Sequence, residues 1–430
     1  MNKDKYQIKK VIGTTLFLLG LGICILLYCE WRGNFAETVL VCREYFLALP
    51  FFAVILTVLY SKKEKRTEKS EKPRKMYLDY ARILAAVCVI LAHACNMQRS
   101  EQAAAWRINL LTICAGLGLV CNSIYVMISG SLLLSSKKKE SLWEFYYGRF
   151  VKVIIPLVVY YAIFLCVSGQ MSFLPPENIG KGFLQILKGE SDIVPHYWLV
   201  YTLISLYIFA PVVRILIGKL NDKQLNICFW LILAMEQVLS LLPLAGIQIN
   251  SLIEFIEWEG VFILGYILTE KRSKKTEKAV LILGGISVVA ICAIILRDYS
   301  YIGYVCNAAP VMVLFGASIL ILLSKIKYVP GKYVGNVIKA LAKYSYSIIL
   351  VHWYGLFVVA WGKMGFQPLR FGCIGGIVLT VTVATGVCFL MGFVGDNTVV
   401  FAVQSLFELP YKMLKKKIDL RMQASKVNSL

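Results

Sequence analysis

Long apolar runs separated by short polar loops dominate the chain. Each run is close to the roughly 20 residues that a helix needs to cross the hydrocarbon core of a bilayer. In lipid, a helix satisfies its own backbone hydrogen bonds. The pattern therefore predicts an all-α, polytopic integral membrane protein with about 12 transmembrane helices. The predicted spans are 11–29, 39–60, 79–97, 108–134, 149–168, 196–217, 225–243, 252–269, 279–296, 302–324, 340–362 and 370–395.

The polar segment 61–75 is the clearest boundary in the chain. It predicts an N-terminal two-helix hairpin at 1–60, a basic cytosolic linker at 61–75, a ten-helix transmembrane domain at 76–395 and a basic cytosolic tail at 396–430. The first apolar run has no convincing small-residue cleavage site, so we interpret it as a retained helix. No loop is long enough to form a soluble domain.

Basic residues alternate between the loops and account for the net charge of +21. Such alternation is the positive-inside pattern of membrane proteins, so the expected partner is the lipid bilayer and not nucleic acid. An even number of spans then places both termini in the cytoplasm, with the protein in the cell membrane. The predicted inner segments are Ser61–Lys75, Lys137–Lys139, Lys271–Lys278, Lys325–Lys339 and the tail from Lys412.

The thirteen cysteines are scattered and fall almost entirely inside predicted spans. They form no Cys-x-x-Cys motif and no Cys/His cluster. Small apolar residues explain this distribution better than a disulfide framework does, and no metal site is expected.

Ionisable residues inside spans are costly and mark function or pairing. The third predicted span carries Asp79, Arg82 and His93, and eleven residues separate Arg82 from His93. At 3.6 residues per turn this spacing gives one polar stripe, with His93 about 16 Å beyond Arg82 along the axis. Asp79 and Arg82 alone would also fit a simple ion pair at a helix end. Histidine suits general-base or nucleophilic work, and arginine suits a phosphorylated donor.

The remaining candidates lie on later spans. Arg149 and Lys152 begin the fifth span and are candidates for holding phosphate, although Lys152 equally fits a side chain that reaches the lipid headgroups. The other two histidines of the chain are His196 and His352. We regard these two histidines as candidates for binding the acceptor or for handling a proton. Trp198 and Glu257 are further candidates for binding the acceptor, and Trp198 also fits an interface anchor.

Six short motifs, each weak alone, occur in a fixed order. They are Asp79, Arg82 and His93; Ser129-Gly130; Arg149, Lys152 and Pro156; His196, Trp198, Tyr207 and Pro211; Phe262, Gly265 and Tyr266; and Ser345, Tyr346, Ile348 and His352. Together they resemble the motifs of the membrane-bound acyltransferase-3 family, over Met76 to Phe393. Two departures are Lys152, where arginine is common, and Ile349, which stands in place of a tyrosine.

The resemblance implies an O-acyltransferase that uses cytosolic acyl-CoA, expected to be acetyl-CoA, and no metal. The acceptor would be a hydroxyl of a cell-surface glycan or its lipid-linked precursor. Arg82, Arg149 and Lys152 would hold the CoA phosphates, Asp79 would hold Arg82, and His93 would accept the hydroxyl proton or carry the acyl group.

Two other classes of function also fit the span pattern. One is a transporter or flippase of a glycan precursor or small solute, which would need no acyl-CoA. The other is a membrane module that supports an amino-acid racemase or serves as a sensor. The absence of a soluble domain from the sequence argues against the racemase version.

Overall fold

The computed structural model describes residues 75–99, 102–135, 141–168, 177–189, 194–242, 246–247, 251–328, 330–408 and 410–411, without the side chains of 177–179 and 251–257. The predicted N-terminal hairpin, residues 61–74 of the linker and most of the tail lie outside these ranges.

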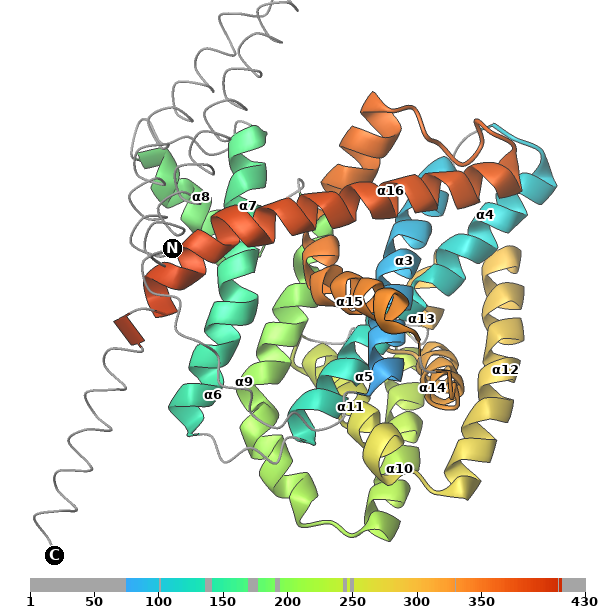
Figure 1. The fold of residues 1–430 in the computed structure, drawn as a ribbon. Helices are drawn as coiled ribbons and strands as arrows, with labels where there is room; N and C mark the ends of the chain where they lie inside the picture. Colours follow the sequence, from blue (N-terminus) through green and yellow to red (C-terminus); the bar gives the residue numbers. More distant parts are fainter. Residues whose placement is uncertain are drawn as a thin grey trace, which may run out of the picture. The chain divides into compact units, whose positions relative to one another are not determined.

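Helices account for nearly all of the described residues, and no strand occurs among them (Figure 1). The α-helices are α3 Met76–Gln98, α4 Ala105–Gly118, α5 Val120–Leu134, α6 Leu142–Arg149, α7 Ile155–Val167, α8 Glu177–Lys188, α9 Trp198–Gly218, α10 Asp222–Leu241, α11 Ser251–Tyr266, α12 Lys274–Arg297, α13 Ile302–Val305, α14 Pro310–Ser324, α15 Lys332–Trp353 and α16 Cys373–Gly395. Shorter 3-10 or π segments are η1 Phe150–Ile154, η2 Pro195–Tyr197, η4 Ile267–Lys271, η5 Tyr299–Tyr301, η6 Tyr354–Lys363 and η7 Asp396–Val400.

Eight helices in the described ranges are long and apolar enough to span a membrane, and a bent pair makes a ninth. The prediction of an all-helical, multi-pass protein is thus confirmed, whereas the count of about twelve is not. The predicted span 302–324 is broken: Tyr299–Val305 and Pro310–Ser324 meet at 66°. Pro310 begins the second piece, where its missing N–H costs nothing. The predicted span 252–269 is helical in α11 and η4 but is not among the nine.

The chain divides into two compact units. The larger unit consists of Pro73–Phe164 and Gln185–Val394 and contains every residue discussed below. The smaller unit consists of Met1–Lys72, Leu165–Leu184 and Gly395–Leu430. Its described part includes the end of α7, most of α8 and the segment that begins with η7.

Two close approaches between backbones lock α5 to α11. A Cβ atom on Gly130 would lie 1.8 Å from the Phe262 carbonyl oxygen, and one on Gly265 would lie 2.0 Å from the Met127 carbonyl oxygen. Only glycine fits such contacts, and small residues are what let membrane helices pack this closely. The crossing fixes α5 beside α11, with Thr269 donating a 2.8 Å hydrogen bond to Ser131 as a further link.

Loops predicted to share the inner side meet at one end of the larger unit. Ion pairs join Lys75 to Glu270, and Lys271 to Asp222 at 2.8 Å. Glu277 also pairs with Arg272 and with Lys325, at 2.8 Å each. The Asp222 carboxylate raises the pKa of Lys271 through its hydrogen bond. We call this the ion-paired end.

Loops predicted to lie outside meet elsewhere in the larger unit. Tyr299 donates a hydrogen bond to the side chain of Asn96, and the Arg99 guanidinium lies 3.3 Å from the centre of the Tyr299 ring. The Leu369 amide donates to Gln98 at 2.8 Å. These contacts surround the C-terminal end of α3, whereas Lys75 places its N-terminal end at the ion-paired end. Loops that the charge alternation predicts on the same side of the membrane are thus also in contact with one another in the structure.

Substitution of Gly130 by alanine should destabilise the protein, because the added methyl group would overlap the Phe262 carbonyl. Overpacking of this kind costs about 1–3 kcal/mol. Thermal unfolding in detergent should show a lower midpoint for Gly130→Ala than for the wild type. The matched control is Gly285→Ala, where a Cβ would meet nothing within 4 Å. Equal midpoints for the two variants would contradict the packing argument.

Candidate active site

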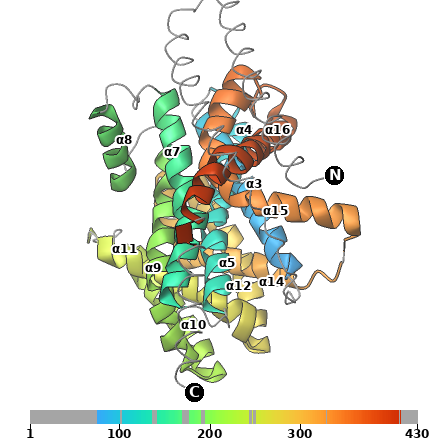
Figure 2. The same ribbon diagram turned by 60° about the vertical axis from the view of Figure 1, so that its left-hand side comes forward.

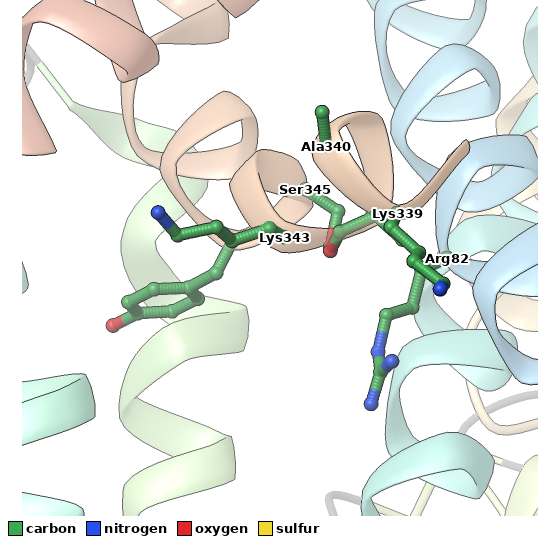
Figure 3. A pocket seen from close by; sticks show the side chains of 7 residues that line it. Arg82, Lys339, Ala340, Lys343 and Ser345 are labelled. Carbon is green, nitrogen blue, oxygen red and sulfur yellow. The ribbon is translucent and has the colours of Figure 1, made fainter. Parts of the chain in front are cut away.

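A basic pocket of about 490 Å³ opens between the N-terminal part of α3 and the middle of α15 (Figure 3). Its cationic side chains are Arg82, Lys339 and Lys343. In Figure 3, Arg82 and Lys339 lie on one side and Lys343 on the other, with the Ser345 side chain between them. Lys339 and Lys343 are one helical turn apart and therefore share a face of α15. Three cations around one opening can bind a polyanion such as a phosphorylated ligand.

Asp79 holds the arginine of this pocket. Arg82 Nη1 donates to the Asp79 carboxylate at 2.9 Å, three residues back on α3. The Asp79 side chain is 1% exposed and that of Arg82 is 25% exposed. The carboxylate therefore needs a cation close by, while the guanidinium retains surface in the pocket. Tyr125 on α5 donates to the Arg82 carbonyl at 3.5 Å and further ties this turn of α3 to its neighbour.

Arg149 and Lys152 are close to this region in the fold but do not line the pocket. Tyr346, which does line it, donates a 2.9 Å hydrogen bond to the Val153 carbonyl next to Lys152. Arg149 ends α6 with its guanidinium 5.1 Å from the centre of the Phe145 ring. The π segment η1 carries Lys152, which is exposed.

The three histidines of the chain come together although they lie on three separate elements. His352, on the last turn of α15, has its ring centre 5.1 Å from that of His93 on α3 and 4.3 Å from that of His196 on η2. Trp353 packs its ring against both His93 and His196, at 5.3 Å and 5.8 Å. We call His93, His196 and His352 the histidine cluster. It could not be predicted from helical spacing, because His196 and His352 lie 103 and 259 positions beyond His93 in the sequence.

Two of these histidines are oriented by backbone carbonyl groups of α15. Nδ1 of His352 is 2.7 Å from the Ile349 carbonyl oxygen, and Nε2 of His196 is 3.3 Å from the Leu350 carbonyl oxygen. Tyr197 also donates to the Leu350 carbonyl, at 3.0 Å. Ile349 stands where the acyltransferase motif has a tyrosine, so its backbone, and not a phenol, makes the local contact. His352 and His196 are buried, whereas His93 is half-buried.

Two helices connect the basic pocket with the histidine cluster. On α3, His93 lies eleven residues beyond Arg82, or about 16 Å along the axis. On α15, His352 lies seven residues beyond Ser345, or about 10 Å. The two helices contact each other and are neighbours in both ribbon views (Figures 1 and 2). An elongated ligand with a charged head and a reactive tail matches this arrangement.

The other predicted acceptor-binding residues lie apart from these contacts. Trp198 follows η2 directly but is 41% exposed, and its ring packs on Trp258 at 5.7 Å. Glu257 lies in α11, and its side chain is outside the described part of the structure. Within the described residues, no group of three His, Cys, Asp or Glu side chains is arranged to hold a metal ion.

Lys339, Lys343 and Trp353 belong to the site but were not singled out from the sequence. The spacing of Lys339, Lys343 and Tyr346 is the signal that was available: these positions follow one face of a helix. Lys339 also ends the basic run Lys325–Lys339, which indicates an orientation signal equally well. For Trp353 the only signal was its position next to a histidine.

Removing Arg82 should destabilise the protein more than removing Asp79. Arg82→Gln takes the guanidinium from a buried carboxylate, whereas Asp79→Asn leaves a guanidinium that still reaches the pocket. Losing one partner of a fully buried pair costs about 3–5 kcal/mol, and the partial exposure of Arg82 should reduce that figure. The measurement is thermal unfolding in detergent.

The double variant Asp79→Asn/Arg82→Gln serves as the control for this comparison. It should be more stable than Arg82→Gln alone, because it no longer buries a carboxylate without its guanidinium. A double variant that is less stable than Arg82→Gln would show that the ion pair is not the cause.

Comparison with known proteins adds one finding. The model of a family described as an acyltransferase domain, Acyl_transf_3, matches residues 76–393. These are the residues over which the motifs resemble the acyltransferase-3 family, so that prediction is confirmed. No curated protein and no solved structure shows a significant match to the chain.

Proposed function

Because the chain belongs to the acyltransferase-3 family, we propose that it transfers an acyl group, specifically acetyl, from cytosolic acyl-CoA to a hydroxyl. The proposed acceptor is a cell-surface glycan or its lipid-linked precursor. The observation that carries the proposal is the placement of a basic pocket and a histidine cluster along the same two helices, α3 and α15. A transferase needs both parts: a grip on the phosphates of CoA and a reactive group near the thioester.

The donor enters at the ion-paired end, which we take to face the cytoplasm of the cell membrane. Arg82, Lys339 and Lys343 bind the phosphates of CoA, with the guanidinium able to contact two oxygens at once. Arg149 and Lys152 lie outside the pocket lining and act as an outer basic rim that attracts the donor. Asp79 acts through Arg82 and is a positioning residue.

The pantetheine arm then extends along α3 and α15 towards the histidine cluster. This places the thioester beside His93, the half-buried histidine of the three. His93 acts on the acyl group there, either as the base for the attacking hydroxyl or as the atom that carries the acyl group. His196 and His352 border the acceptor. Trp198 and Glu257 belong to the approach of the glycan.

Neutralising the pocket lysines should weaken donor binding. A hydrogen bond to a charged group contributes about 1.5–3 kcal/mol, so Lys339→Gln and Lys343→Gln should each raise the Kd for acetyl-CoA by roughly tenfold or more. Arg82→Gln should do the same, and Lys152→Arg should be tolerated. Binding of labelled acetyl-CoA to the purified protein in detergent measures this.

Lys332→Gln is the matched control for this experiment. Lys332 is exposed, lies on the same helix and does not line the pocket. It changes the net charge equally but should leave the Kd unchanged. If Lys332→Gln weakens binding as much as Lys343→Gln does, general electrostatic attraction and not the pocket explains the affinity.

Loss of His93 should nearly abolish transfer. Acid–base catalysis contributes about 10²–10⁴-fold in rate, so His93→Gln should lose at least that factor at matched membrane abundance. The assay follows the acetyl label of acetyl-CoA into the glycan fraction of membranes with and without the protein. Near-normal transfer by His93→Gln would remove the residue from the mechanism. No acetyl-CoA-dependent label in wild-type membranes would favour a transporter.

A further inference from the structure

The hydrogen bond of His352 defines where its proton lies. A carbonyl oxygen only accepts, so the contact of 2.7 Å between Nδ1 and the Ile349 oxygen requires hydrogen on Nδ1. In a neutral imidazole the other nitrogen, Nε2, then carries the lone pair. The backbone of α15 thus sets the ring in the form that can accept a proton at Nε2.

Nε2 of His352 is buried and has no hydrogen-bond partner among the described residues. Buried polar atoms nearly always have a partner, and exceptions call for an explanation. The His93 ring lies nearly parallel to that of His352, with 27° between their planes. It therefore covers a face of the ring, whereas Nε2 lies on the ring edge. This stacked contact therefore gives the Nε2 lone pair no hydrogen-bond partner.

His196 repeats this arrangement with its nitrogens exchanged. Its Nε2 faces the Leu350 carbonyl, so Nε2 carries the hydrogen and Nδ1 carries the lone pair. Nδ1 is also buried without a partner among the described residues. Two neighbouring acceptor nitrogens cannot satisfy each other, so the site is suited to a group that donates hydrogen bonds. A hydroxyl-bearing ligand is such a group.

We propose that His352, through Nε2, is the base that removes the proton of the acceptor hydroxyl, and that His196 Nδ1 accepts a hydrogen bond that positions the acceptor. The assignment rests on the proposed acyltransferase function and deepens it. With His352 as the base, His93 has the other role proposed for it, which is to carry the acyl group. His93 and His196 are the titratable groups that face His352 in the described residues.

His93 first takes the acyl group: a ring nitrogen of His93 bonds to the thioester carbonyl carbon and the C–S bond breaks, which releases the CoA thiolate. The O–H bond of the acceptor then breaks and its proton moves to Nε2 of His352, while the oxygen bonds to the acyl carbon and the bond between that carbon and His93 breaks. The imidazolium of His352 is stabilised by the Ile349 carbonyl on its Nδ1 side and then gives its Nε2 proton to the thiolate. The products are the ester and CoA with a free thiol, and both histidines are neutral again.

Asparagine and glutamine at position 352 separate catalysis from structure. The amide nitrogen of His352→Asn can replace Nδ1 and still donate to the Ile349 carbonyl, but the variant has no base at the Nε2 position. His352→Gln lacks both the base and that local donor. If His352 only holds the helix end, Asn should rescue function and Gln should not.

The experiment uses the full chain in membranes of the expressing cells, with acetyl-CoA labelled in its acetyl group as the probe. We expect both variants to lose 10²–10⁴-fold in transfer rate, with the KM for acetyl-CoA and its Kd within about twofold of wild type. The control is His196→Gln, which keeps a donor towards Leu350 and should mainly raise the acceptor concentration needed for half-maximal rate.

Near wild-type transfer by His352→Asn would overturn the assignment and indicate a structural role. Loss of acetyl-CoA binding in His352→Asn would overturn it as well, because the residue would then belong to the donor site. Neither outcome affects the acyltransferase proposal, which fails instead if wild-type membranes transfer no label from acetyl-CoA.

Discussion

The high cost of leaving a polar group unpartnered in a nonpolar interior governs the arrangement of this protein. Backbone groups meet that cost by forming helices, and several charged side chains meet it by pairing where loops come together. The ion pairs that join Lys75 to Glu270 and Lys271 to Asp222 are of this kind. The buried Asp79 meets it within α3 through Arg82. Nδ1 of His196 and Nε2 of His352 are among the buried atoms that have no hydrogen-bond partner within the described residues.

Helix α15 brings two different environments together. The part of α15 up to Lys343 carries exposed lysines, including Lys339, and borders the basic pocket. The part after Lys343 is mostly buried and contains His352, and carbonyl groups of its last turns orient His352 and His196. Helix α3 shows the same order, with Arg82 near its N-terminal end and His93 further along. Both helices therefore lead from charged residues at the pocket to a histidine of the cluster. Any ligand that bridges the two sites must therefore have the same chemical asymmetry.

Much of the helical pattern could be predicted because lipid makes local hydrophobicity decisive. The span predicted at 79–97 corresponds to α3 at Met76–Gln98, and the spacing along it places Arg82 and His93 on one stripe. The bend before Pro310 was missed because 302–324 reads as one apolar run. The meeting of His196 with His352 depends on how distant helices pack, which no local period encodes. The position of Lys343 in the pocket lining was missed because a basic residue near the end of a predicted span has a more common explanation in lipid.

The π-helical segment η6 begins directly after Trp353 and thus adjoins the histidine cluster. A π turn has more residues than an α turn, and such bulges are usually explained as single-residue insertions into a helix. Here the wider turns of η6 change the angular positions of the side chains around the helix axis relative to those in α15. The residues up to Trp353 keep the phase set by α15, while Gly355 and its successors follow another, in which Gly355 packs against Cys388 of α16. The π segment therefore changes which side of this continuous helix meets α16, directly after the turn of α15 that holds His352 and Trp353.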